Sequence, residues 1–138
     1  NKINDFDRNF LRNEIFPLLD NRWNNFAQRI NTMSHIIQER NVNYTNLFLE
    51  KHGELVGHKI DINKLKTLQE SLIIDVLRYS IKACNIAVPN SKIMKEIVKT
   101  FINSDPGSKS QVSWSRSDKE EPGGMVTYKK GFLLISKK

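Results

Sequence analysis

Two arginines near the start of the chain, Arg8 and Arg12, stand four residues apart in a stretch whose pattern predicts a helix. On a helix this spacing places the two guanidinium groups one above the other on one face. Apolar residues lie on both sides of that helix: Leu11, Ile15 and Leu19 on the arginine side, and Phe6, Phe10 and Pro17 on the opposite side. We therefore expect burial on two sides. The arginines then need anionic partners, which could be carboxylates of this protein or phosphates.

A second group of basic residues recurs at helical spacing later in the chain: Lys92, Lys95 and Lys99. They lie opposite an apolar stripe, formed by Ile93, Ile97 and Phe101. Such a row can follow the phosphate backbone of a nucleic acid. The solvated face of any amphipathic helix has the same pattern, so both interpretations stay open. Three aromatic residues near the C-terminus could stack on bases or pack in the core: Trp114, Tyr128 and Phe132.

The residue types that serve catalysis or metal binding form no recognisable motif. The three histidines are far apart in the sequence, at His35, His52 and His58. Cys84 is the single cysteine, so no intrachain disulfide can form and no metal-ligand spacing is present. The sequence Pro122-Gly123-Gly124 predicts a hairpin turn rather than a phosphate-binding loop. We expect no complete active site and no metal site in this chain.

The net charge of +7 is concentrated in the later part of the chain. Residues 1–50 carry six basic and six acidic residues, residues 51–100 carry nine and five, and residues 101–138 carry seven and four. This excess favours a polyanionic partner, although a solvated surface alone would also explain it. The apolar runs are too short for a membrane span, and no signal peptide is evident. We expect a cytoplasmic protein with no membrane partner.

Helices are predicted over most of the first hundred residues. The first should end or kink sharply near residue 16, because Pro17 lacks a backbone donor and biases Phe16 away from helical angles. A long helix follows from about residue 23 to 51, with an apolar row at three- and four-residue steps: Phe26, Ile30, Met33, Ile37, Tyr44, Leu47 and Phe48. Two further helices are expected over residues 69–83 and, capped by Asn90 or Ser91, up to Phe101.

The pattern changes to alternation after a turn at residues 104–108. Three strand-like segments follow, at 111–116, 125–129 and 132–135, joined by glycine-containing turns. Residues 58–62 also alternate and could form a short strand. The predicted fold class is mainly α with α+β character: a bundle-like helical domain followed by a small three-stranded antiparallel β meander over 111–136.

The opening helix carries a pattern of arginine, asparagine, aliphatic residues and proline at fixed spacing: Arg8, Asn9, Leu11, Arg12, Ile15, Pro17 and Leu19. This pattern resembles a signature of bacterial tRNA(Ile)-lysidine synthetase. Residues 85–91 resemble that family's junction between two helices, which holds a Pro-Ser or similar pair. Residues 126–133 resemble its aromatic and basic β tail. The resemblance spans nearly the whole chain.

This resemblance implies a region C-terminal to the family's ATP-pyrophosphatase (PP-loop) catalytic domain, because the Ser-Gly-Gly-x-Asp-Ser loop of that domain is missing here. The implied enzyme is an ATP-dependent ligase that adenylates the wobble cytidine of an isoleucine tRNA. L-lysine then displaces AMP to give lysidine. ATP and Mg would bind to the catalytic domain, and the fragment alone would be inactive. Residues 1–22 would be a linker helix to that domain, and residues 23–138 a tRNA-binding domain, helical to about 103.

The resemblance also suggests roles for the basic residues. Arg8 and Arg12 are expected at an interface with the catalytic domain, or at a phosphate near its active site. The candidate tRNA-binding residues are basic side chains of the later segments: Lys59, Lys64, Lys66, Arg78, Lys92, Lys95, Lys99, Arg116, Lys129 and Lys130. Two alternatives remain: a structural helical domain that buttresses the catalytic domain without contacting RNA, and an unrelated helical interaction domain.

Overall fold

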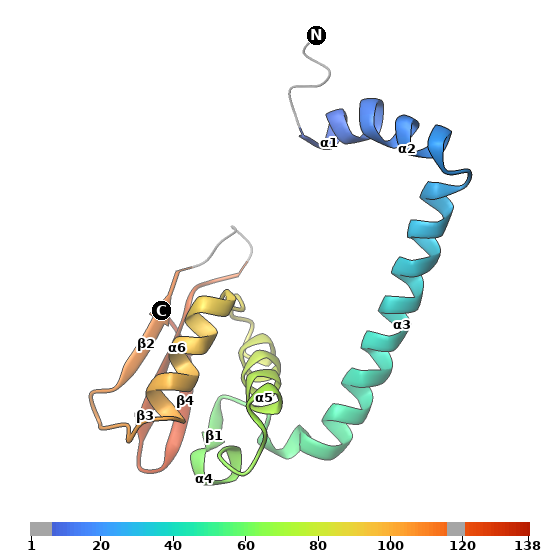
Figure 1. Ribbon diagram of the computed structural model, residues 1–138. Helices are drawn as coiled ribbons and strands as arrows, with labels where there is room; N and C mark the ends of the chain where they lie inside the picture. Colours follow the sequence, from blue (N-terminus) through green and yellow to red (C-terminus); the bar gives the residue numbers. More distant parts are fainter. Residues whose placement is uncertain (1–6, 116–120) are drawn as a thin grey trace. The chain divides into compact units, whose positions relative to one another are not determined.

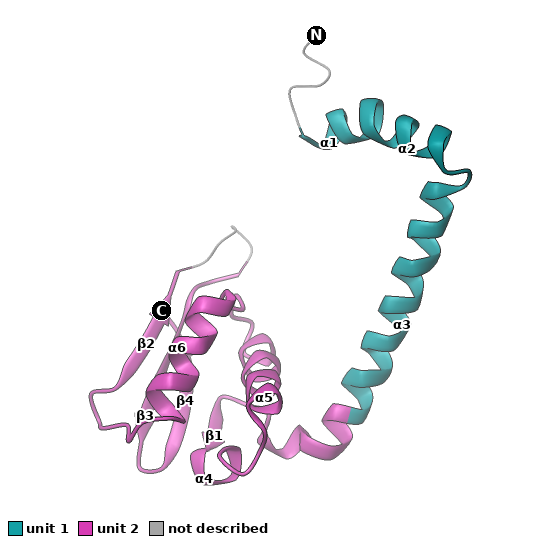
Figure 2. Cartoon of the chain, in the orientation of Figure 1, with its two compact units in different colours: residues 1–47 teal, residues 48–138 magenta. Residues whose placement is uncertain are grey.

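The computed structural model describes residues 7–115 and 121–138 (Figure 1). Its helical elements are α1 (Asp7–Phe10), the π-helical turn η1 (Leu11–Ile15), α2 (Phe16–Arg22), α3 (Phe26–His52), the 3-10 turn η2 (Gly53–Leu55), α4 (Ile62–Leu65), α5 (Glu70–Ala83) and α6 (Ser91–Phe101). Its strands are β1 (Lys59–Asp61), β2 (Gln111–Trp114), β3 (Gly124–Lys129) and β4 (Phe132–Lys137). The chain divides into two compact units, Asn1–Leu47 (unit 1) and Phe48–Lys138 (unit 2) (Figure 2).

The start of unit 1 is an uninterrupted helical run from α1 through η1 to α2. Ile15 and Phe16 both keep right-handed helical angles, so the interruption predicted near residue 16 is a change from π to α geometry rather than an end. The Phe16 N–H donates to the carbonyl of Leu11, five residues back. Pro17 then falls in the first turn of α2, where its missing N–H costs little.

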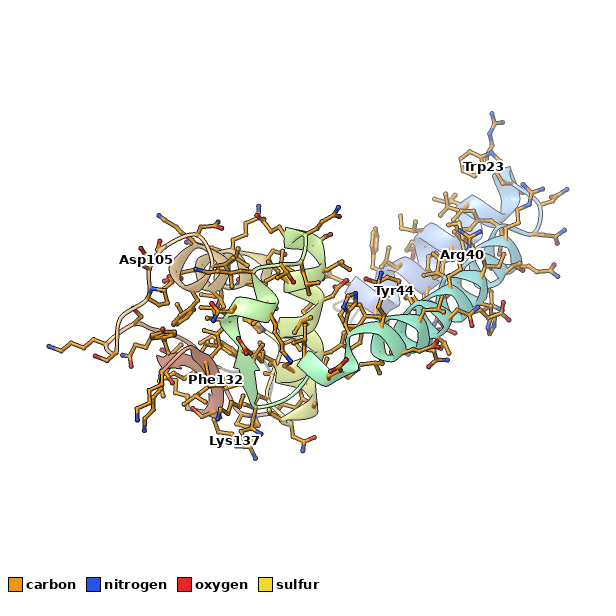
Figure 3. All side chains as sticks on the ribbon, turned by 90° about the horizontal axis from the view of Figure 1, so that it is seen from below. Trp23, Arg40, Tyr44, Asp105, Phe132 and Lys137 are labelled. Atoms are coloured by element: carbon orange, nitrogen blue, oxygen red, sulfur yellow. The ribbon has the colours of Figure 1, made fainter. Side chains whose placement is uncertain are left out.

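A tight turn joins α2 to α3. Asn25 takes the left-handed conformation, with φ of 64°, which asparagine tolerates better than most residues. The carboxylate of Asp20 accepts a hydrogen bond from the backbone N–H of Ala27 at 3.1 Å, so it satisfies a free donor in the first turn of α3. The rings of Trp23 and Phe26 lie 6.5 Å apart across this turn, and Trp23 projects outward from it (Figure 3).

The apolar row predicted along α3 is mostly exposed. Within Phe26–His52 only Phe48 is buried. The rest of the row is partly or largely exposed: Phe26, Ile30, Met33, Ile37, Tyr44 and Leu47. The predicted long helix is confirmed, and of its apolar row only Phe48 joins the core of the described residues. Periodicity shows that a helix has an apolar side and does not show what covers that side.

The sheet of unit 2 is antiparallel, with strand order β1-β4-β3-β2. The predicted meander of β2, β3 and β4 is confirmed, and β1 adds a fourth strand by pairing with β4. At the β3–β4 turn, Lys130 and Gly131 both have positive φ, of 48° and 85°. This geometry suits the right-handed twist of a two-residue hairpin.

The core of unit 2 lies between this sheet and the helices α5 and α6, which cover one of its faces (Figure 1). It is formed by aliphatic and aromatic side chains from both layers, among them Val76, Leu77, Ile81, Ile97, Phe101, Val112, Val126 and Leu133. Asn90 caps α6 by accepting from the Ile93 N–H at 3.0 Å, as the sequence predicts. The predicted fold class, mainly α with α+β character, is therefore confirmed.

Candidate nucleic-acid interface

The arginine pair lies at the start of unit 1. Arg8 belongs to α1 and Arg12 to η1, and both side chains are exposed. No residue of Asp7–Arg22 is buried within this chain, so the described residues do not supply the burial on two sides that the sequence predicts. The apolar residues Phe10, Leu11 and Leu18 are exposed alongside the arginines.

The lysine row of α6 is assembled as the sequence predicts. Lys92, Lys95 and Lys99 are all exposed, while the other side of α6 is buried in the core. We call these three residues the α6 row. Because the buried side of α6 faces β2 and α5, the α6 row points away from the sheet.

A second basic cluster lies at one end of the sheet, and it comes from three separate segments. Lys59 stands on β1, Lys64 on α4, and Lys129 and Lys130 at the β3–β4 turn. Two contacts hold these segments together: the pairing of β1 and β3 with β4, and the hydrogen bond from the Ile62 N–H to the Gly131 carbonyl at 3.0 Å. We call these four exposed lysines the basic sheet end.

The other predicted basic residues belong to neither cluster. Lys66 is exposed at the C-terminal cap of α4 and lines a shallow polar cleft with Glu70. Arg78 on α5 forms an ion pair with Asp75, one turn earlier, at 3.9 Å. At such exposure this pair contributes little to stability. Arg116 lies outside the described residues.

The three aromatic candidates have different environments. Trp114 is buried, and its indole N–H donates to the Ala87 carbonyl at 2.6 Å, so its ring belongs to the core. Tyr128 is half-buried and packs against the same core. Phe132 is half-buried on the opposite face of the sheet, where the Lys59 ammonium lies 4.1 Å from its ring centroid. Sequence alternation marks all three as strand residues but does not show that β1 brings Lys59 to Phe132.

The described residues contain no group of three His, Cys, Asp or Glu side chains that could hold a metal ion. Burial raises the pKa of the Cys84 thiol, which makes it a poor nucleophile. No helix of the described part is long and apolar enough to cross a membrane. What the described residues do assemble is basic surface, with one half-exposed aromatic ring among the lysines.

Comparison with known proteins finds curated relatives of the chain. No protein-family model matches the chain. Curated relatives do match: a tRNA(Ile)-lysidine synthase of Haemophilus ducreyi is 29% identical over 107 residues, which are 75% of this chain and 25% of the relative. The chain is similar to tRNA(Ile)-lysidine synthases. The synthase of Legionella pneumophila is 26% identical over 118 residues, 84% of this chain and 27% of the relative.

A synthase of Buchnera aphidicola from Acyrthosiphon pisum shows the same coverage, with 26% identity over 74% of this chain and 24% of the relative. The chain thus spans about a quarter of the length of the curated lysidine synthases it matches. The resemblance inferred from the arginine signature is confirmed. The partial coverage is consistent with a C-terminal region of such an enzyme.

Proposed function

We propose that this chain is the tRNA-binding region of a tRNA(Ile)-lysidine synthase. The observation that carries this proposal is the exposure of the α6 row and the basic sheet end in a chain similar to enzymes named for acting on tRNA(Ile). Exposed lysines attract the phosphates of RNA and release condensed counterions when they bind. The neighbouring phenylalanine adds a surface on which a base can stack.

The chemistry of lysidine formation would take place in another part of the enzyme. As a ligase, the whole enzyme would use ATP, Mg and L-lysine to convert the wobble cytidine of an isoleucine tRNA to lysidine. The residues present here do not fit ATP and Mg: the sequence has no glycine-rich phosphate loop, and the described residues hold no cluster of metal ligands. The function of this region is therefore to hold the tRNA rather than to react with it.

Unit 1 would connect this region to the catalytic domain. Its helices expose large apolar side chains, including Leu18 at 66% and Met33 at 54%. Phe16, Phe26 and Ile30 line one apolar hollow, and exposed apolar surface of this kind marks an interaction site. We place the catalytic domain on it because about three quarters of the relatives' length is not matched by this chain. Residues 1–22 would form the linker helix, with Arg8 and Arg12 meeting carboxylates or a phosphate of that domain.

Titration of the 138-residue chain with an isoleucine tRNA transcript, followed by fluorescence anisotropy, tests the proposal. If about four phosphates are contacted, affinity should fall roughly 50- to 150-fold between about 50 and 200 mM salt. Absence of binding, or binding that salt does not weaken, would contradict it. If the full-length enzyme needs this region for activity but the region binds no tRNA, the region acts instead as a structural buttress.

The role of the arginine pair requires the full-length enzyme. Replacing Arg8 and Arg12 together by Ala should strongly reduce lysidine formation, because two charge-assisted contacts at the domain interface are lost. Both side chains are exposed in this chain, so its circular dichroism spectrum and melting temperature should stay unchanged. Full activity of the double variant would show that the pair has no such role.

A further inference from the structure

The sheet of unit 2 has two different faces. Alternate strand residues point toward α5 and α6 and are buried, among them Ile60, Val112, Val126, Leu133 and Ile135. The residues between them, on the other face, are half-buried or exposed. We call this other face the open sheet face and define it by Lys59, Gln111, Thr127, Lys129, Phe132 and Leu134.

Strand register places Phe132 between two lysines on this face. Lys129 of β3 stands directly opposite Phe132 of β4. On the other side, the Lys59 side chain of β1 reaches diagonally, so that its ammonium lies 4.1 Å from the Phe132 ring centroid. Phe132 is the half-buried side chain labelled beside the sheet in Figure 3. An aromatic ring flanked by two cations thus lies on a face that the helices do not cover.

The carboxylate opposite Phe132 in the strand register already accepts hydrogen bonds from backbone N–H groups. Asp61 stands opposite Phe132 on β1, but its side chain accepts hydrogen bonds from the N–H groups of Asn63 at 2.9 Å and Lys64 at 3.4 Å. These bonds cap α4, and the positive end of the helix stabilises the negative charge. Both bonds go to Oδ1 of Asp61, so two N–H dipoles offset part of the repulsion between its carboxylate and an approaching phosphate.

We infer that the open sheet face binds unpaired nucleotides, with a base stacked on Phe132 and the flanking phosphates held by Lys59 and Lys129. This inference rests on the proposed tRNA-binding function and names the surface and the form of RNA that it recognises. Stacking on a side chain requires a base that is free of its own helix, so the partner is single-stranded RNA. Before binding, the Lys59 ammonium covers the ring by a cation–π contact. A base can replace it there while the ammonium moves to a phosphate.

Two exposed lysines outside both basic clusters offer an internal control: Lys82 of α5, and Lys137 at the end of β4 opposite to Phe132. Removing these two lysines, or two from the open sheet face, changes the net charge equally. A difference in RNA affinity between two such variants therefore reports the location of the site rather than the overall charge.

The experiment measures binding of the 138-residue chain to an isoleucine tRNA transcript and to a short single-stranded RNA. Phe132→Leu, which keeps apolar volume but removes the ring, should weaken both affinities about tenfold, whereas Phe132→Tyr should stay within about twofold of the original chain. Replacing Lys59 and Lys129 by Ala should reduce the slope of log K against log salt by about 2. Replacing Lys82 and Lys137 by Ala should change this slope less.

A reporter variant covers the case in which Phe132→Leu fails to fold. In Phe132→Trp, stacking of a base on the new indole should quench fluorescence when single-stranded RNA is added, and duplex RNA should not. If the original chain binds no tRNA, the proposed function fails, and the inference fails with it. If the chain binds tRNA, but the sheet-face variants bind as tightly as the original and the reporter is not quenched, tRNA binding stands and the open sheet face is excluded.

Discussion

Gly124 lies where β3 passes directly beneath the indole ring of Trp114, its partner across the sheet. A Cβ atom added at this position would lie 2.5 Å from Cζ2 of Trp114 and 2.6 Å from Cγ2 of Ile86. Neither side chain can move outward, because Trp114 is 6% exposed and Ile86 is 1% exposed. Gly124→Ala therefore forces a rearrangement inside the core of unit 2.

The magnitude follows from two costs and one gain. Overpacking a close-packed core costs about 1–3 kcal/mol. If the indole is displaced, its hydrogen bond to the Ala87 carbonyl at 2.6 Å is strained or lost, which adds about 1–3 kcal/mol for a buried unsatisfied donor. The smaller conformational freedom of unfolded alanine offsets about 0.4–1 kcal/mol. We expect a net loss of about 2–4 kcal/mol in the free energy of unfolding.

Urea denaturation followed by tryptophan fluorescence measures this loss. Trp114 is buried and Trp23 is 53% exposed, so Trp114 should dominate the change in signal. With a slope of about 1 kcal/mol per molar urea, the midpoint should fall by about 2–4 M. The matched control is Gly107→Ala, because a Cβ there meets no atom within 4 Å.

A double-mutant cycle with Trp114→Phe tests the cause, with unfolding of all four chains followed by far-UV circular dichroism because this substitution removes the fluorescent reporter of unit 2. Phenylalanine lacks the outer indole ring that a Cβ at Gly124 would strike, so Gly124→Ala should cost less in that background, with a coupling of about 1–2 kcal/mol. The reasoning is refuted if Gly124→Ala is as stable as the control to within about 0.5 kcal/mol. It is also refuted if the cost is equal in both backgrounds.

Two further predictions concern single residues of unit 2. Asn90→Ala removes the side-chain acceptor of the Ile93 N–H at the start of α6 and should lower the free energy of unfolding by about 1 kcal/mol in urea titrations, whereas Asn90→Asp should preserve it. Because burial raises the pKa of the Cys84 thiol, the thiolate should form only at higher pH than in a free cysteine. Iodoacetamide should then label Cys84 faster in urea than in the folded chain, and equal labelling rates at neutral pH would contradict this.

Local rules predicted most of unit 2, because the apolar sides of its helices and strands pack against one another within that unit. Alternation predicted a strand at 111–116, which is observed at Gln111–Trp114, and of the two environments left open for Trp114 the structure shows the core. The Lys130-Gly131 turn was predicted from glycine chemistry and adopts two positive φ angles. The pairing of β1 with β4 could not be predicted in this way, since register between distant segments depends on the whole sheet. The cation–π contact of Lys59 with Phe132 depends on that pairing.

In unit 1 the same rules predicted the helices but not what covers their apolar sides. The steric rule for Pro17 predicted an end or a sharp kink near residue 16, but it could not show that a π turn would keep the run helical. The apolar row of α3 has the spacing of a core face, and Leu47 is nevertheless 66% exposed. An interface helix and a core helix bury the same stripe, so sequence alone does not distinguish them.

The apolar surface of unit 1 and the basic surface of the later chain differ in charge. Substitutions in the two surfaces should therefore change different kinetic constants. Residues 1–50 carry equal numbers of acidic and basic residues, and their described helices expose apolar side chains. Such a surface suits a protein interface, whose core is depleted in charge. The basic excess lies beyond residue 50, where the exposed lysines suit RNA.

In the full-length enzyme, substituting Met33 by a charged residue should therefore lower kcat with little change in tRNA affinity, whereas removing the lysines of the open sheet face should raise KM for tRNA. If both substitutions lowered tRNA affinity to the same extent, unit 1 would be part of the RNA site. The proposal that unit 1 contacts the catalytic domain would then be wrong.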